Sequence, residues 1–78
     1  MKIIIAGAGD LGFHLAKLLS FESHDIYIID KSDEKLNYIS THLDVFTIIG
    51  DATSPQLLID YKIHEADILL AVCYKKAL

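Results

Sequence analysis

Three glycines stand close together near the start of the chain, at Gly7, Gly9 and Gly12 of the stretch GAGDLG. They follow a β-branched apolar run and precede a leucine-rich helical pattern, so they mark a predicted strand-to-helix junction. There the first glycine permits a tight turn, the second lets a phosphate approach the backbone, and the third allows close helix packing. The helix start would present unpaired N–H groups to an anion. The spacing therefore predicts a loop that holds a diphosphate.

An acidic residue closes the next predicted strand. Asp30 lies 18 residues after Gly12, close to the offset of about 20 at which a carboxylate accepts hydrogen bonds from ribose hydroxyls. The plainer interpretation is a structural turn with an incidental aspartate, and the combined context favours nucleotide binding over it. A carboxylate here repels a 2′-phosphate, so NAD(H) or ATP, ADP or AMP is favoured over NADP(H). Lys31 weakens this exclusion.

A second loop of interest follows the third predicted strand, in the stretch IGDAT (residues 49–53). Gly50 permits a close approach, and the Asp51 carboxylate could accept a hydrogen bond from an adenine amino group. Alternatively, Asp51 and Thr53 only organise the turn before the next helix. The residues alone leave both interpretations open.

The scaffold for these loops is an alternation of strands and helices. Strands are predicted at Lys2–Ala6, Asp25–Asp30, Asp44–Ile49 and Ala66–Cys73. Helices are predicted from Leu11 to about Phe21, after Ser32 as far as about His42, and after Ser54 with Pro55 in the first turn. Their buried positions are expected to be Leu11, Leu15, Leu18 and Leu19 in the first helix, Leu36, Ile39 and either Leu43 or Tyr38 in the second, and Leu57, Leu58 and Tyr61 in the third. This order predicts a Rossmann-like three-layer α/β/α fold whose parallel sheet has the strand order 3-2-1-4.

Composition excludes several classes of function. The 78 residues allow one small domain, and a net charge of −4 without a basic stripe argues against nucleic acid as a partner. No apolar run is long enough for direct membrane insertion. The four histidines share no metal-ligand spacing, and no serine has a base at a suggestive spacing. We therefore predict neither a metal site nor catalytic residues, and the single cysteine fits a reducing cytoplasm.

Four stretches resemble one known family: IIIAGAGDLGFHLAKLLS, DIYIID, DVFTIIGDATSPQLL and EADILLAV. They are similar to the N-terminal nucleotide-binding domain of Trk-type potassium uptake regulators, called TrkA-N, RCK or KTN. The resemblance spans Met1 to Val72, and its most specific part is the GDAT-SP-LL segment. It implies a cytoplasmic regulatory domain that binds NAD(H) or ATP, ADP or AMP. It also implies dimers held at the inner face of the membrane by a potassium transporter or channel subunit.

The resemblance also assigns roles to individual residues. It implies that Gly7, Gly9 and Gly12 form the phosphate loop, with Ala8, Asp10 and Leu11 between them. Asp30 would take the ribose with Lys31 beside it, and Asp51 and Ala52 would lie near the adenine. Asp10 stands where the family often has Glu.

The resemblance also bears on the extent of the domain. Family members usually continue after the fourth strand with a Ser or Thr, an acidic-Asn stretch and two more strands, whereas this sequence reads CYKKAL over residues 73–78. We therefore expect residues 1–78 to be a truncated domain, the first half of the full sheet. The fourth strand would then be an exposed edge, which predicts self-association as a symmetric dimer through that side.

Two other functions remain open from the sequence. The chain could be the N-terminal cofactor-binding fragment of an NAD-dependent dehydrogenase, whose catalytic residues would lie in a second domain. It could also be an assembly fragment whose half-site is too open to hold a nucleotide.

Overall fold

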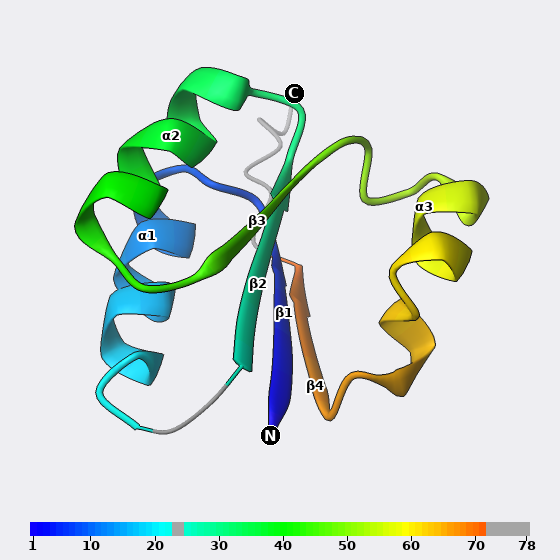
Figure 1. Ribbon diagram of the computed structural model, residues 1–78, viewed down its shortest axis with the longest axis horizontal. Coiled ribbons are helices and arrows are strands. Elements are labelled where there is room, and N and C mark those ends of the chain that lie inside the picture. Colours follow the sequence, from blue (N-terminus) through cyan, green and yellow to red (C-terminus); the bar gives the residue numbers. More distant parts are fainter. Residues whose placement is uncertain (23–24, 72–78) are drawn as a thin grey trace, which may run out of the picture.

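Four parallel strands form one sheet in the order β3-β2-β1-β4, as the sequence predicts. The computed structural model describes residues 1–22 and 25–71. Its elements are β1 (Lys2–Ala6), α1 (Asp10–Leu19), β2 (Asp25–Asp30), α2 (Asp33–His42), β3 (Phe46–Ile49), α3 (Pro55–Asp60), the 3₁₀ helix η1 (Ile63–Glu65) and β4 (Ile68–Ala71). Helices α1 and α2 cover one face of the sheet and α3 lies over the other, which confirms the three-layer α/β/α architecture (Figure 1).

The two cores of the domain lie on opposite faces of β1 and β2. Alternate side chains of a strand point to opposite faces. The α1–α2 side therefore buries Ile3, Ile5, Ile26 and Ile28, and the α3 side buries Ile4, Ile29 and Ile48. Both central strands are covered on both faces, which explains why their sequences are continuously apolar instead of alternating.

Helix α1 packs through its small residues, which differs from the sequence prediction. Gly12 and Ala16 are its buried positions, whereas Leu11 and Leu18 are 58% and 66% exposed. Residues four apart share one helix face, and a face of Gly and Ala lets the helix axis approach the sheet closely. The leucines expected in the core therefore lie on the flanks, with only Leu15 and Leu19 half-buried against it.

Several element boundaries also differ from the prediction. Helix α1 ends at Leu19 instead of Phe21, β3 begins at Phe46 instead of Asp44, and β4 begins at Ile68 instead of Ala66. Tyr61, expected in the core, is 49% exposed because it follows the end of α3. The predicted end of the last strand at Cys73 lies outside the described residues. The predicted caps are confirmed: the Ser32 and Ser54 side chains accept from the N–H groups of Lys35 and Leu57.

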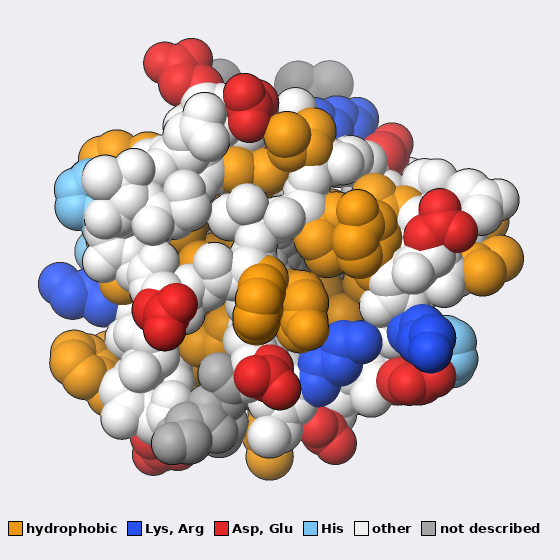
Figure 2. Space-filling model, viewed as in Figure 1, with side chains coloured by type: hydrophobic (Ala, Val, Ile, Leu, Met, Phe, Trp, Pro, Cys, Tyr) orange, Lys and Arg blue, Asp and Glu red, His pale blue; other side chains and the backbone are white. Residues whose placement is uncertain are grey.

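Apolar side chains also reach the surface of the domain. Figure 2 shows them gathered along the middle of one face, between the α1–α2 layer and α3. On the α3 side of the sheet, the Tyr27 and Phe46 rings stack with centroids 4.8 Å apart, and the Lys2 ammonium lies 5.3 Å from the Tyr27 centroid. Within the described part of the chain, no helix has the length and apolar character needed to cross a membrane.

Candidate nucleotide-binding site

The glycine loop between β1 and α1 leaves the sheet with a constrained backbone. Gly7 has φ of 126°, a value that residues with a side chain rarely adopt. Its N–H donates to the Ile29 carbonyl over 2.8 Å, so the loop starts as an extension of the β1–β2 pairing. The positive φ of Gly7 therefore explains why the tight turn predicted at this position favours a glycine.

Gly9 differs from Gly7 because its backbone conformation does not require a glycine. Its φ of −76° and ψ of −166° are open to any residue. A Cβ built on Gly9 would meet no atom within 4 Å. The empty volume beside this backbone is the kind of cradle that a phosphate group would fill.

The start of α1 is also distinctive among the three α-helices of the described residues. Serine side chains cap α2 and α3, whereas α1 begins at Gly9 with no side-chain cap. The first N–H groups of a helix have no partner inside the helix. At α1 they therefore face the glycine loop without a competing side-chain acceptor, as an anion site requires.

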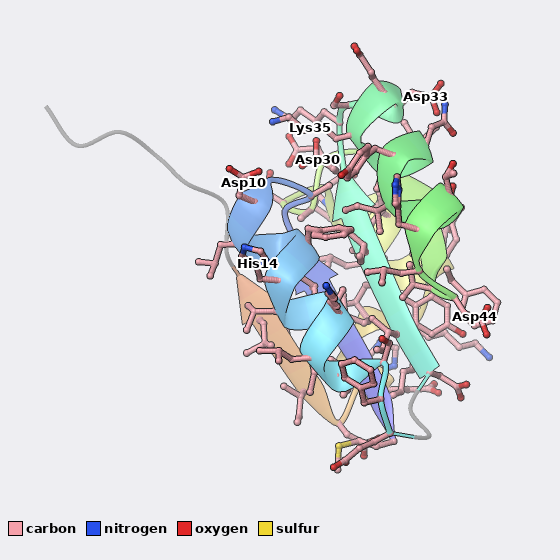
Figure 3. All side chains as sticks on the ribbon, turned by 90° about the vertical axis from the view of Figure 1, so that its left-hand side faces the viewer. Asp10, His14, Asp30, Asp33, Lys35 and Asp44 are labelled. Carbon is pink, nitrogen blue, oxygen red and sulfur yellow. The ribbon has the colours of Figure 1, made fainter. Side chains whose placement is uncertain are left out.

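Asp30 ties the loops at this edge of the sheet together. One oxygen of its half-buried carboxylate accepts from the Ala8 N–H and the other from the Ser32 N–H, each over 2.8 Å. Its carbonyl accepts from the Gly50 N–H over 2.9 Å. Each carboxylate oxygen has two acceptor positions, so one on each oxygen remains for a ribose diol. Figure 3 shows Asp30 between the starts of α1 and α2, at the same end of the sheet as Asp10 and Lys35.

Asp51 is fixed by its own turn. Its Oδ1 accepts from both the backbone N–H and the hydroxyl of Thr53, over 2.8 and 2.6 Å. Its Oδ2 lies 3.5 Å from the Lys31 ammonium. These interactions, first of all the Thr53 hydroxyl, hold the pKa of Asp51 below its usual value. The turn-organising role that the sequence left open is therefore present, and Oδ2 keeps acceptor capacity for a ligand.

A cavity of about 290 Å³ lies between the carboxyl ends of β2 and β3. It is lined by Ile29, Asp30, Lys31, Gly50, Asp51, Ala52 and Thr53. Parallel sheets bind ligands at this end of their strands. The structure thus brings Asp30, Lys31, Asp51 and Ala52 together around one hollow beside the glycine loop. Asp10 and Leu11 are exposed at the start of α1, where only their backbone belongs to the loop.

A second hollow of about 350 Å³ was not anticipated from the sequence. It lies on the other side of the glycine loop, between α1 and α2, and is lined by Ala8, Gly9, Asp10, Phe13, His14, Lys35 and Tyr38. The Phe13 and Tyr38 rings, 5.6 Å apart between centroids, come from α1 and α2. The available signal in the sequence was one aromatic residue on each of two neighbouring predicted helices.

Comparison with protein families identifies this arrangement. The family described as the TrkA-N domain matches residues 3–77. This chain belongs to the TrkA-N family. The match includes the glycine loop, Asp30 and the turn at Asp51, so it covers the whole candidate site of this TrkA-N domain. The resemblance seen in the sequence is thereby confirmed.

Individual relatives of this TrkA-N domain carry consistent names. The "Trk system potassium uptake protein TrkA" of Azorhizobium caulinodans is 38% identical over 72 residues, 92% of this chain and 16% of that protein. A "Trk system potassium uptake protein TrkA homolog" of Archaeoglobus fulgidus is 43% identical over the same shares. A homolog of that name from Pyrococcus abyssi is 39% identical, and the match covers 32% of its length. The chain thus spans about one sixth to one third of the length of these relatives.

Proposed function

We propose that this TrkA-N domain binds an adenine nucleotide, NAD(H) or ATP, ADP or AMP, at the carboxyl edge of its sheet. The observation that carries the proposal is the hydrogen bond from the Ala8 N–H to the Asp30 carboxylate. This hydrogen bond supports the proposal because it joins the carboxylate that would accept from the ribose to the loop that would hold the diphosphate. The uncapped start of α1 and the open space at Gly9 then supply the anion site beside it.

The ribose and the base have counterparts in the cavity between the ends of β2 and β3, whereas Gly9 lines the second hollow. The ribose hydroxyls would donate to the free acceptor positions of Asp30. The half-buried Ala52 offers an apolar surface to a purine ring, and Asp51 Oδ2 offers an acceptor to the adenine amino group. All three parts would be held by neighbouring loops that the Asp30 side chain and backbone already connect.

Calorimetric titration tests the proposal directly. We expect at least one of NAD⁺, NADH, ATP, ADP and AMP to bind with a dissociation constant in the micromolar range, and inorganic phosphate to bind far more weakly because it offers neither ribose nor base. Failure of all five nucleotides to bind at millimolar concentration would favour the assembly-fragment interpretation instead.

We further propose that the bound nucleotide regulates a Trk-type potassium uptake system, with this domain in the cytoplasm at the inner face of the membrane. The names of the relatives support this role, since they are potassium uptake proteins. They also disfavour the alternative of a dehydrogenase cofactor fragment. In this proposal the domain is not an enzyme. It would act through a membrane potassium transporter or channel subunit.

We propose a symmetric dimer formed through β4. In the described part of the chain, no strand pairs with the outer edge of β4, and Ile68 and Leu69 are 38% and 55% exposed. A free strand edge with apolar side chains favours pairing with another copy. Light scattering after size exclusion is expected to give twice the monomer mass at micromolar concentration. Leu69→Lys should shift the protein towards monomer, whereas the same change at the exposed Leu18 on α1 should not.

A further inference from the structure

An ion pair joins two of the residues that line the candidate cavity. Lys31 follows β2 and Asp51 follows β3, and their charged groups lie 3.5 Å apart, on the Asp51 side to which the adenine is assigned above. Among the described residues that line this cavity, Lys31 is the basic one. Where its ammonium group lies therefore decides which part of a ligand experiences positive charge.

The two partners of this pair are held very differently. The Lys31 side chain is 76% exposed and flexible by nature, whereas Thr53 fixes the Asp51 carboxylate with two hydrogen bonds. The fixed anion therefore determines the position of the mobile cation. Asp30 accepts only from backbone N–H groups, and no lysine or arginine of the described residues pairs with it. The ribose end of the cavity is accordingly left with an uncompensated carboxylate.

We propose that the Lys31–Asp51 ion pair makes this site selective for adenine nucleotides with an unmodified ribose, because it holds the cation of the cavity at the base end. This inference rests on the proposed nucleotide site and names its specificity determinant. A free 2′-hydroxyl can donate to Asp30. A 2′-phosphate carries roughly two negative charges and would meet the Asp30 carboxylate without a cation beside it.

Asp51→Asn separates this mechanism from simple repulsion by Asp30. Asparagine keeps the Oδ1 acceptor for Thr53 and so preserves the turn, but it releases Lys31. The freed ammonium can then reach a 2′-phosphate. NADH and NADPH differ only in that group, and both can be titrated by their own fluorescence. We expect the ratio of their dissociation constants, NADPH over NADH, to fall on the order of fivefold in Asp51→Asn.

A double-variant comparison provides the control. Lys31→Met alone should change the NADPH-to-NADH ratio less than about twofold, since Lys31 is already drawn away from the ribose. Combined with Asp51→Asn, it should return the ratio to the wild-type value. An unchanged ratio in Asp51→Asn, with NADH still bound, would overturn the inference while leaving the proposed function intact. Failure of the wild-type protein to bind either dinucleotide, or any of the five nucleotides above, would overturn both.

Discussion

Asp30→Ala is expected to weaken nucleotide binding at least a hundredfold and to destabilise the free protein. The change removes the ribose acceptor and also leaves the half-buried Ala8 and Ser32 N–H groups without their partner. A hydrogen bond to a charged group contributes about 1.5–3 kcal/mol. Losing the two hydrogen bonds from the ribose hydroxyls to Asp30 would therefore lower the affinity by this amount. We expect the free energy of unfolding to fall by about 2 kcal/mol, because water can replace part of the loss. Calorimetry and urea denaturation measure the two effects.

Two further variants show whether nucleotide binding depends on the hydrogen bonds of Asp30 or only on a negative charge at this end of the sheet. Asp33→Ala removes an exposed carboxylate from the first turn of α2, at the same end of the sheet, and should leave the affinity unchanged within about twofold. Asp30→Asn keeps an acceptor for one N–H but not for both, so an intermediate loss is expected. Hydrogen exchange at the Ala8 amide should accelerate in Asp30→Ala without any ligand. Wild-type affinity in Asp30→Ala would remove Asp30 from the site.

Gly9→Val is expected to weaken nucleotide binding on the order of a hundredfold while the domain stays folded. The Gly9 backbone tolerates a side chain, and a Cβ there meets no protein atom within 4 Å. Any loss of affinity would therefore come from the ligand that the valine displaces. A diphosphate pushed away from the start of α1 loses about two charge-assisted hydrogen bonds, which corresponds to a decrease on the order of a hundredfold. Titration with the nucleotide that binds the wild type measures this loss.

The thermal midpoint distinguishes this result from unfolding. It should stay close to the wild-type value, because the gain from restricting the unfolded chain offsets the weaker preference of valine for the N-cap of α1. Leu11→Ala is the matched control in the same loop: its side chain is exposed, only its N–H would contact a phosphate, and its affinity should match the wild type. Undiminished binding by a folded Gly9→Val protein would show that the ligand does not approach this backbone.

The fold was predictable because its signals are strong and local. Short apolar runs rich in isoleucine favour strands buried on both faces, and their alternation with helices leaves few topologies. The error at α1 has a specific origin: leucine spacing suggested the buried face, while the sheet selected Gly12 and Ala16 because small residues permit closer packing. Hydrophobic periodicity alone does not distinguish a helix face that fills the core with large side chains from one whose small residues let the helix lie close to the sheet.

The site was predictable in its backbone and less so in its side-chain contacts. The glycine positions and Asp30 follow from spacing, because the carboxyl ends of the parallel strands β1 and β2 meet at the same edge of the sheet. The Lys31–Asp51 pair joins residues from loops that only the β2–β3 register makes neighbours. No spacing in the sequence indicates that Lys31 and Asp51 form an ion pair. The second hollow, at Phe13 and Tyr38, likewise arises from the packing of α1 beside α2.

The register of β4 bears on the order in which the domain assembles. β1 and β2 are joined by one helix, whereas β4 pairs with β1 from the far end of the described chain, Ile68 beside Ile3. Closing the longer loop loses more chain entropy, so β4 is expected to dock last during folding and to detach first on unfolding. The Ala8–Asp30 contact belongs entirely to the earlier β1–α1–β2 unit. The contact between the glycine loop and Asp30 should therefore form before β4 docks and persist after β4 detaches.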